Sequence, residues 1–249
     1  MILIRLFQTI GQYILFMGKV LKKPEKWWIF YREMVKEIEK IGLNSIWIVA
    51  IISAFMGAVI TMQTAYNTEN PFLPDYLIGV AARDSILLEF SSTIVALILA
   101  GKVGSNIASE IGTMRITEQI DALEIMGVNS ANYLVLPKVV ASILFNPFLC
   151  IMSIFVGIAG GWAAGALTGV ITTQQYLEGI LYAFVPYYIL YAVIKTIVFA
   201  IIITTISSFY GYYVNGGSLE VGSSSTKAVV YSSVTILLFN LILTQLLLS

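Results

Sequence analysis

Four stretches of the sequence contain no charged residue and are each long enough to cross a lipid bilayer. They are residues 41–68, 139–177, 196–219 and 228–249. A helix needs about 20 consecutive apolar residues to traverse the hydrocarbon core of a membrane. These runs predict an all-α integral membrane protein, with residues 1–249 forming a single membrane domain.

The composition agrees with a membrane location and excludes most kinds of catalytic site. Of the 249 residues, 58% are hydrophobic and 11% are charged, whereas a soluble domain has about 25% charged residues. The formal net charge is zero, which gives no indication of a nucleic-acid partner. A single cysteine, Cys150, and the absence of histidine exclude a disulfide framework, a zinc cluster and a serine–histidine triad. We therefore expect no catalytic residue, metal or cofactor in this chain.

A fifth span requires a charged residue inside the membrane. Residues 90–101 are only 12 uncharged residues, so a helix there crosses the bilayer only if it also carries Glu89. The run after Lys195 must likewise extend back to about residue 187, and polar residues 172–175 suggest a loop before it. The predicted spans are residues 43–65, 77–107, 138–166, 187–212 and 228–248.

The distribution of basic residues orients the chain. Eight of the 14 Lys and Arg residues lie in the first 40 positions, which by the positive-inside rule places the N-terminus in the cytoplasm and, after five spans, the C-terminus outside. Residues 2–22 are too short to cross and are predicted to form an interfacial helix, although a sixth span is the alternative. Residues 25–40 are predicted to form a cytoplasmic connecting helix, and Arg83 falls in an external loop.

Glu89 and Lys195 are the ionisable residues that cannot be moved out of their spans. Each costs about 2.5 to 3.5 kcal/mol at the centre of a helix, so such residues usually face a partner or a water-filled cavity. They either line a polar cavity for a substrate headgroup or form a buried ion pair, with the carboxylate also satisfied by residues 91–93. Asn240 is a weaker candidate for the same cavity, because interhelical hydrogen bonding also explains it.

Glycines recur at every fourth position in and just after the third span. Gly157, Gly161 and Gly165, followed by Gly169, form successive GxxxG steps on one helix face. Such a face allows another backbone to approach closely. It predicts helix packing, and the spacing leaves open whether the neighbour belongs to the same subunit or to a second copy.

A charged segment, ASEIGTMRITEQIDALEIMG at residues 108–127, separates the second and third spans. Thr117 suits an N-cap and Gly127 suits the residue after a helix end, which predicts a short helix over residues 118–126. Its acidic residues recur every third position, so the helix is amphipathic, and a solvated cytoplasmic loop is the alternative. No G-x-x-x-x-G-K-[ST] motif occurs, so the energy for any transport must come from another chain.

These residues also carry a family resemblance. The run EFSSTIVALILAGKVGSNIASEIGTMRITEQIDALEIMGVN (89–129) resembles the signature region of the MlaE family of ABC-transporter permeases. The segments VIKTIVFAI (193–201) and VYSSVTILLFNLILT (230–244) are also similar to that family. Leu88, Ser91, Ser92 and Asn240 depart from its usual pattern, and the loss of a Gly-Pro pair at 91–92 suggests a less sharply broken second helix.

The resemblance implies a homodimeric permease of the bacterial inner membrane, with five spans and no enzyme activity of its own. It implies a cytoplasmic MlaF-like ATPase that binds ATP and magnesium, a periplasmic MlaD-like MCE-domain protein and a small STAS-domain protein. The implied cargo is phospholipid, moved between the inner membrane and the outer-membrane side of a Gram-negative-type envelope.

By the same resemblance, Glu89 and Lys195 would line the lipid cavity, next to the candidate Asn240, and residues 110–127 would form the coupling helix region that contacts the ATPase. The coupling residues that the resemblance implies are Glu110, Met114, Arg115, Glu118, Asp121 and Glu124.

Two other classes of function remain as alternatives. One is an ion-coupled secondary transporter or channel that uses Glu89 and Lys195, and the other is a scaffold that only anchors a periplasmic complex.

Overall fold

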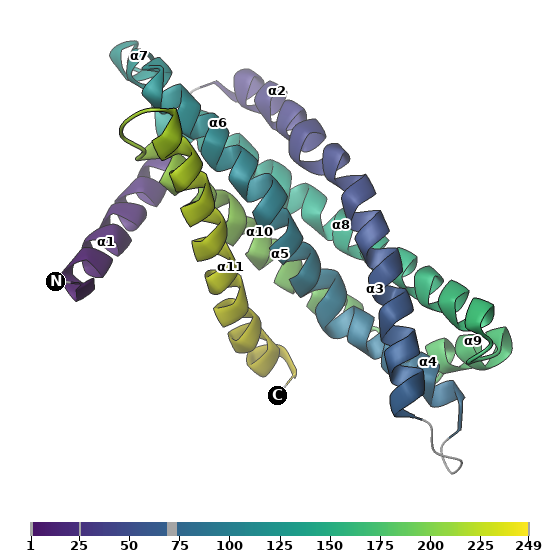
Figure 1. Ribbon diagram of the computed structural model, residues 1–249. Coiled ribbons are helices and arrows are strands. Elements are labelled where there is room, and N and C mark those ends of the chain that lie inside the picture. Colours follow the sequence, from purple (N-terminus) through teal and green to yellow (C-terminus); the bar gives the residue numbers. More distant parts are fainter. Residues whose placement is uncertain (1, 25, 69–73, 249) are drawn as a thin grey trace. The chain divides into compact units, whose positions relative to one another are not determined.

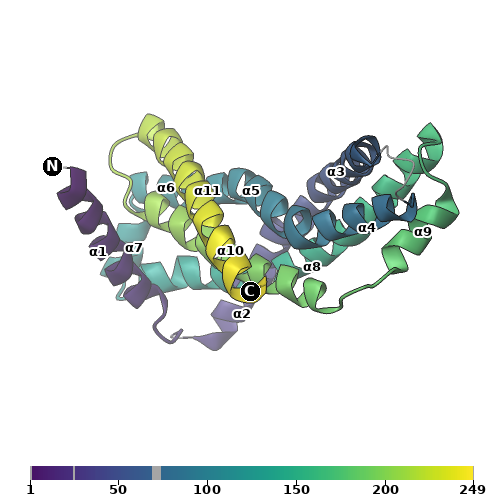
Figure 2. The ribbon, with the colours of Figure 1, turned by 90° about the horizontal axis from the view of Figure 1, so that it is seen from below.

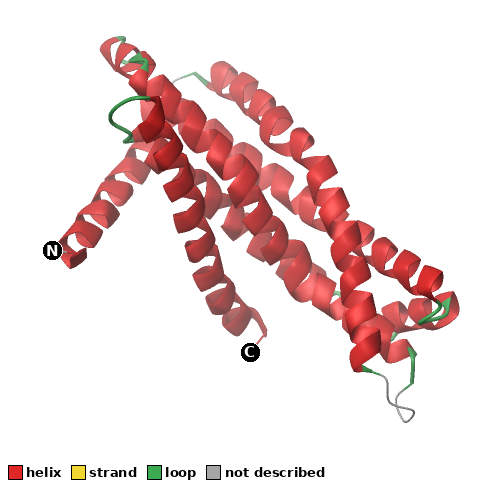
Figure 3. Cartoon of the chain, viewed as in Figure 1, coloured by secondary structure: helices red, strands yellow, loops and turns green. Residues whose placement is uncertain are grey.

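The computed structural model describes residues 2–24, 26–68 and 74–248, and every regular element among them is helical (Figure 3). Five helical runs are long and apolar enough to cross a membrane. The prediction of an all-helical chain with a short N-terminal helix and five spans is confirmed, and the chain is a multi-pass membrane protein. The five runs are Trp27–Asn67, Tyr76–Ile116, Ser130–Thr168, Tyr187–Tyr212 and Ser218–Leu248.

The individual elements follow one another in the order drawn in Figure 1. The second run contains two π-helical segments, η3 and η4, between its α-helical parts. The elements are α1 (Ile2–Val20), α2 (Trp27–Glu37), η1 (Ile38–Gly42), η2 (Leu43–Ser45), α3 (Ile46–Asn67), α4 (Tyr76–Ser85), η3 (Ile86–Ile94), α5 (Val95–Leu99), η4 (Ala100–Gly104), α6 (Ser105–Ile116), α7 (Gln119–Ile125), α8 (Ser130–Thr168), α9 (Thr173–Leu181), α10 (Tyr187–Tyr212) and α11 (Ser218–Leu248).

The chain divides into two compact units, and three long helices contribute to both. The first unit contains residues 1–43, 99–145 and 199–239. The second contains residues 44–98, 146–198 and 240–249. The early part of α8 and the late part of α10 therefore belong to the first unit, while the rest of each helix belongs to the second.

In the first unit, α1 packs against α10 through aromatic side chains. Phe16 is fully buried, and its ring meets the rings of Phe209 and Tyr212 at centroid distances of 5.9 and 5.1 Å. The Tyr13 hydroxyl donates to Thr205 Oγ1 at 2.7 Å. On its other face α1 exposes apolar side chains, among them Leu15 at 71%. An amphipathic helix with an exposed apolar face is typical of the membrane interface.

In the second unit, close helix contacts depend on glycine. Gly57 of α3 meets the backbone of Gly157 of α8 so closely that a Cβ at Gly57 would overlap the Gly157 carbonyl. Helix α4 lies beside α9 (Figures 1 and 2), where a Cβ at Gly79 would come within 2.7 Å of the Tyr176 carbonyl oxygen. These contacts follow the small-residue packing rule of membrane helices.

The other glycines of the α8 series have different surroundings. A Cβ at Gly161 would overlap Thr61 Oγ1, and one at Gly165 would lie 2.6 Å from the Ile171 side chain. The neighbours of Gly157, Gly161 and Gly165 thus belong to the same chain. Gly169 instead follows the end of α8 with a φ of +71°, the left-handed conformation that suits a residue after a helix end.

Gly57→Ala is expected to lower the free energy of unfolding by about 1 to 3 kcal/mol, the usual cost of overpacking. Gly222→Ala is the matched control, since no heavy atom of the described residues lies within 4 Å of a Cβ built there; we expect that change to be neutral or stabilising, because alanine favours a helix. Thermal unfolding in detergent, followed by tryptophan fluorescence, compares the two. Equal midpoints would contradict the close contact.

The helices of the structure differ in extent from three segments that the sequence suggested. Residues 172–175 are not a loop: Thr172 and Gln175 form a capping box that starts α9, with the Thr172 hydroxyl oxygen accepting from the Gln175 amide. Helix α8 begins at Ser130, two turns before the predicted start at residue 138. The connecting helix begins at Trp27 and runs through η1 and η2 into α3, while residue 25 lies outside the described residues.

Arg83 does not lie in a loop, as the sequence suggested, but in α4, where it is 2% exposed. Its Nη1 donates to the carbonyl oxygens of Ile180 and Tyr182 at 2.8 and 2.7 Å, and its Nε donates to Asp84 at 2.8 Å. The end of α9 supplies those carbonyls, and a cation is favourable at a helix C-terminus. Burial of this charge is therefore compensated by α9, the helix that the sequence analysis missed.

Candidate functional site

Glu89, Lys195 and Asn240 lie together in the second unit. Glu89 belongs to η3, Lys195 to α10 and Asn240 to the last part of α11. Lys195 Nζ is 3.2 Å from Glu89 Oε1, and Asn240 Nδ2 donates to Glu89 Oε2 at 3.1 Å. Three polar residues from separate spans thus form one cluster, which we call the Glu89 cluster.

Lys195 is fully buried and uses all three of its donors. Besides the ion pair with Glu89, Nζ donates to the Leu88 carbonyl oxygen and to the Tyr191 hydroxyl, each at 3.1 Å. It also lies 4.7 Å from the centroid of the Tyr191 ring, within the range of a cation–π interaction. The ammonium group is therefore held in place by its own chain and has no donor left for a ligand.

Glu89 differs, because 42% of its side chain is exposed. The Thr93 hydroxyl lies 3.0 Å from Glu89 Oε2 and 2.9 Å from Asn240 Oδ1, and its single proton serves one of these acceptors at a time. Thr244 approaches the other carboxylate oxygen at 3.5 Å. The cluster therefore presents a partly exposed carboxylate at its rim.

The backbone around Glu89 is π-helical over Ile86–Ile94. Such segments are rare and occur frequently at functional sites. The neighbouring serines do not support the carboxylate: Ser91 Oγ lies 3.5 Å from the Leu87 carbonyl oxygen, and Ser92 Oγ has no hydrogen-bond partner among the described residues. Of the three residues at 91–93, only Thr93 bonds to Glu89 within the described chain.

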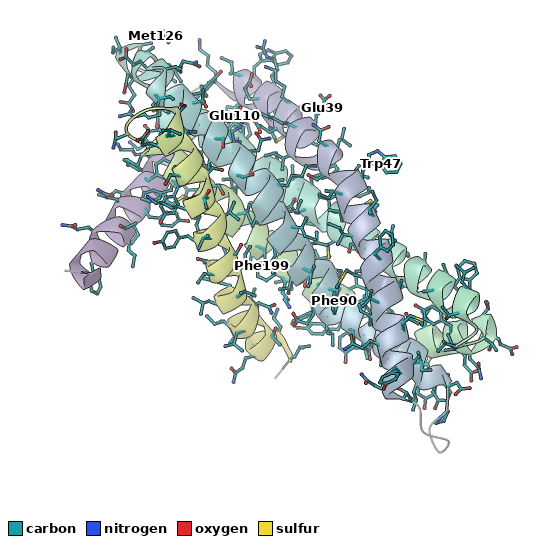
Figure 4. The ribbon with its side chains drawn as sticks, in the orientation of Figure 1. Glu39, Trp47, Phe90, Glu110, Met126 and Phe199 are labelled. Atoms are coloured by element: carbon teal, nitrogen blue, oxygen red, sulfur yellow. The ribbon has the colours of Figure 1, made fainter. Side chains whose placement is uncertain are left out.

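A second charge cluster in the first unit escaped the sequence analysis. Lys138, 3% exposed, lies 2.5 Å from Glu37 Oε1 and 3.0 Å from Glu110 Oε2. Lys40 completes the cluster at 2.7 Å from Glu110 Oε2. Figure 4 labels Glu110 on α6. The cluster joins α2, η1, α6 and α8, so Glu110, predicted to contact a partner, is committed to its own chain.

The charged segment forms a short helix, α7 (Gln119–Ile125), but Thr117 is not its N-cap. Thr117 is instead the C-cap residue of α6, and its hydroxyl donates to the Thr113 carbonyl oxygen at 2.8 Å. Glu118 precedes α7 in the left-handed conformation, with φ of 59°. At the other end, Gly127 has φ of +79°, and its amide donates to the Glu124 carbonyl, as expected for a glycine after a helix end.

Most of the predicted acidic face bonds within the chain. Arg115 Nη1 pairs with Asp121 Oδ1 at 2.6 Å, and Glu124 Oε1 accepts from the hydroxyls of Tyr212 and Ser130 at 2.7 and 2.9 Å. Met114 is half-buried, and Glu118 is exposed. The free surface at the end of α7 is largely apolar: Ile125 is 88% exposed and Met126, labelled in Figure 4, is 68% exposed.

The hydrogen bonds from Tyr212 and Ser130 hold the pKa of Glu124 below its ordinary value of 4.5. A carboxyl with a lowered pKa stabilises the fold above its ordinary pKa, and this contribution disappears as the pH falls through the lowered value. We expect the thermal midpoint of the native chain to fall more steeply below pH 4.5 than that of Glu124→Gln. Tyr212→Phe, which keeps the ring but removes the donor, is expected to reduce the pH dependence. Identical pH profiles for all three chains would contradict this role.

Comparisons with known proteins identify the family. The model of the family "Permease MlaE" matches residues 34–246. A probable ABC transporter permease protein of Rickettsia bellii is 35% identical over 98% of this chain and 93% of its own length. Another, from Synechocystis sp., is 34% identical over 86% of this chain and 81% of its own.

A plant relative extends the range of similar proteins. The chloroplastic protein TRIGALACTOSYLDIACYLGLYCEROL 1 of Arabidopsis thaliana is 33% identical over 92% of this chain and 65% of its own length. The family match covers most of the chain, and the Rickettsia bellii relative is matched over nearly its whole length. The chain therefore belongs to the MlaE permease family and is the permease subunit of an ABC transporter, a class that works with an ATPase partner.

Proposed function

We propose that this permease moves phospholipids between the inner membrane and the outer-membrane side of a Gram-negative-type envelope. Membership of the MlaE family supports this function, and the name of the Arabidopsis thaliana relative is that of a glycerolipid. The cargo is an amphiphile, so its site must offer a polar group within a largely apolar chain.

The rim carboxylate of Glu89 is the observation that carries the proposal. A charge within a span costs about 2.5 to 3.5 kcal/mol at the helix centre unless a partner or water offsets it. Lys195 neutralises the carboxylate from the buried side, while 42% of the Glu89 side chain stays exposed. A lipid headgroup that carries an ammonium or hydroxyl donor would approach this exposed side of the carboxylate, with Asn240 as a neighbouring polar contact.

The proposed assembly follows the family. Two copies of the chain form a homodimer in the bacterial inner membrane, with the N-terminus cytoplasmic and the C-terminus periplasmic. An MlaF-like ATPase binds ATP and magnesium, an MlaD-like MCE-domain protein binds on the periplasmic side, and a small STAS-domain protein accompanies the ATPase. Affinity purification of the chain from its native membrane tests this assembly: a Walker-motif ATPase and an MCE-domain protein should copurify, and their absence would contradict it.

The ATPase is proposed to act on α7. Arg115 pairs with Asp121, so that α7 is tied to α6, and Glu110 ties α6 to Lys138 of α8. Helix α6 is the last part of the run Tyr76–Ile116, which also carries Glu89. Movement of α7 by the ATPase would therefore be passed to the helical run that holds the lipid site.

Ile125→Asp is expected to reduce the amount of copurified ATPase at least tenfold, since burial of a large apolar side chain contributes about 1.5 to 3 kcal/mol. Leu219→Asp introduces the same charge at a leucine of nearly equal exposure, 85% against 88%, and is expected to keep the ATPase. Quantitative mass spectrometry of the purified complexes compares them. Full retention of ATPase by Ile125→Asp would remove α7 from the interface.

A further inference from the structure

A basic pocket lies in the first unit, where the connection between α1 and α2 meets the end of α7 and the first turns of α8. Its volume is about 460 Å³, within the range of small-molecule sites. Lys22, Lys23 and Lys26 line it, and it contains no residue of the Glu89 cluster. We call this site the basic pocket.

Two asparagines near the start of α8 hold the walls of the basic pocket together. Asn132 Nδ2 donates to the carbonyl oxygens of Val20 and Lys22 at 2.7 and 2.6 Å. Asn129 Nδ2 donates to the carbonyl oxygen of Lys19 at 3.0 Å. The backbone at the end of α1 and at Lys22 is therefore fixed to the start of α8 by these two side chains.

Among the described lining residues, three lysines stand against one carboxylate. No carboxylate in the described part of the chain forms an ion pair with them. Glu33 is the acidic residue among the described lining residues, and its Oε1 is 2.7 Å from Lys36 and 3.8 Å from Arg32. The pocket thus suits an anion.

One wall of the pocket is apolar, and aromatic residues lie next to the lysines in the sequence. Exposed aromatic residues follow the lysines directly: Trp27 is 57% exposed and Trp28 is 81% exposed. Tryptophan is enriched at headgroup depth in membrane proteins. A soluble anion has no use for an apolar wall, whereas an amphiphile does. That wall is formed by Ile29, Phe30, Leu123, Val128 and Pro137.

We propose that the basic pocket binds the headgroup of an anionic phospholipid, with the phosphate on the lysines and the glycerol region against the apolar wall. Basic pockets at the cytoplasmic ends of membrane helices bind such headgroups, and the cytoplasmic leaflet is the anionic one. Because Leu123 and Val128 flank the end of α7, the bound lipid also contacts the proposed coupling segment. This binding does not depend on the proposed transport activity.

The test uses the full chain in detergent, with Trp47→Phe and Trp162→Phe so that Trp27 and Trp28 report. Phosphatidylglycerol with brominated acyl chains is titrated in mixed micelles, and quenching of tryptophan fluorescence is measured. We expect saturable quenching by this lipid and none by brominated phosphatidylcholine. In Lys23→Gln/Lys26→Gln the half-quenching concentration should rise about 25-fold, at about fivefold for each lysine.

Lys19→Gln/Lys227→Gln is the matched control, because it removes two exposed lysines that do not line the pocket. Its half-quenching concentration should stay within about twofold of the native value. An equal loss in both double variants would overturn the proposal in favour of general surface charge. Displacement of the lipid by millimolar inorganic phosphate would overturn it in favour of a soluble phosphate, whereas no displacement is expected.

Discussion

Lys138→Met is expected to lower the free energy of unfolding by about 3 to 5 kcal/mol, the cost of leaving a buried charge without its partner. Glu37 Oε1 bonds to Lys138, and Glu37 Oε2 is buried with no partner among the described residues. The loss of Lys138 therefore leaves the Glu37 carboxylate uncompensated. Unfolding by a denaturing detergent, followed by tryptophan fluorescence, measures the effect.

Two further variants make this result specific. Lys40→Met removes a lysine that is 40% exposed and shares Glu110, so we expect a change of at most about 1 kcal/mol. Adding Glu37→Gln to Lys138→Met removes the orphaned charge and should recover much of the stability. If Lys138→Met and Lys40→Met unfold at the same concentration of denaturing detergent, the ion pairs of Lys138 with Glu37 and Glu110 are not a major source of stability.

Glu89→Lys is expected to reduce lipid transport at least tenfold while the chain still inserts into the membrane. It would place a second ammonium group next to the buried Lys195, and two like charges about 4 Å apart repel by about 4 kcal/mol at an effective dielectric constant near 20. The same change also removes the rim carboxylate. Sensitivity of the outer membrane to detergents, together with the amount of chain in the membrane fraction, measures both consequences.

The charge swap Glu89→Lys/Lys195→Glu separates the ion pair from the rim carboxylate. It restores the attraction between the two positions, so stability should recover, but the exposed group becomes an ammonium and transport should stay low. Glu178→Lys, the same substitution at an exposed carboxylate of α9, is expected to transport normally. Normal transport by the swapped chain would mean that only the ion pair matters.

The number of spans could be predicted because the thickness of the bilayer fixes the length of apolar helix that is needed. The start of α8 could not be placed by that rule. Lys138 was taken as the edge of the span, but Glu37 and Glu110 neutralise it, and both are remote in sequence. A single sequence does not reveal such partners, so it did not predict that the helix extends from the span at 138–166 back to Ser130.

Two local signals were misjudged for different reasons. The pattern Thr172 to Gln175 is a capping box and could have revealed α9, although its polar residues suggested a loop. Thr117 has the composition of an N-cap, but its hydroxyl bonds back to the preceding turn, which is a known competitor of capping. The sequence therefore held enough information to place the start of α9. For Thr117, the hydroxyl could bond either to the following turn as an N-cap or to the preceding turn, and the sequence did not decide between these two bonds.

The polar residues inside the spans were identified from the sequence, but their arrangement was not. Glu89, Lys195 and Asn240 were singled out because charge and amide groups are costly in hydrocarbon. Their contacts join positions more than 100 residues apart, so spacing could not distinguish a cavity from an ion pair. The structure contains the ion pair, and it leaves the outer side of the Glu89 carboxylate exposed.

Transfer of a radiolabelled phospholipid between reconstituted membranes measures the proposed function itself. The complex of this chain with its ATPase and MCE-domain partner is placed in donor liposomes, and lipid that reaches acceptor liposomes is counted with and without ATP. We expect transfer that requires ATP and is lost in Glu89→Lys while ATP hydrolysis persists. Transfer by the chain alone under an ion gradient, or undiminished ATP-driven transfer by Glu89→Lys, would contradict an ATP-powered lipid permease that uses the Glu89 cluster.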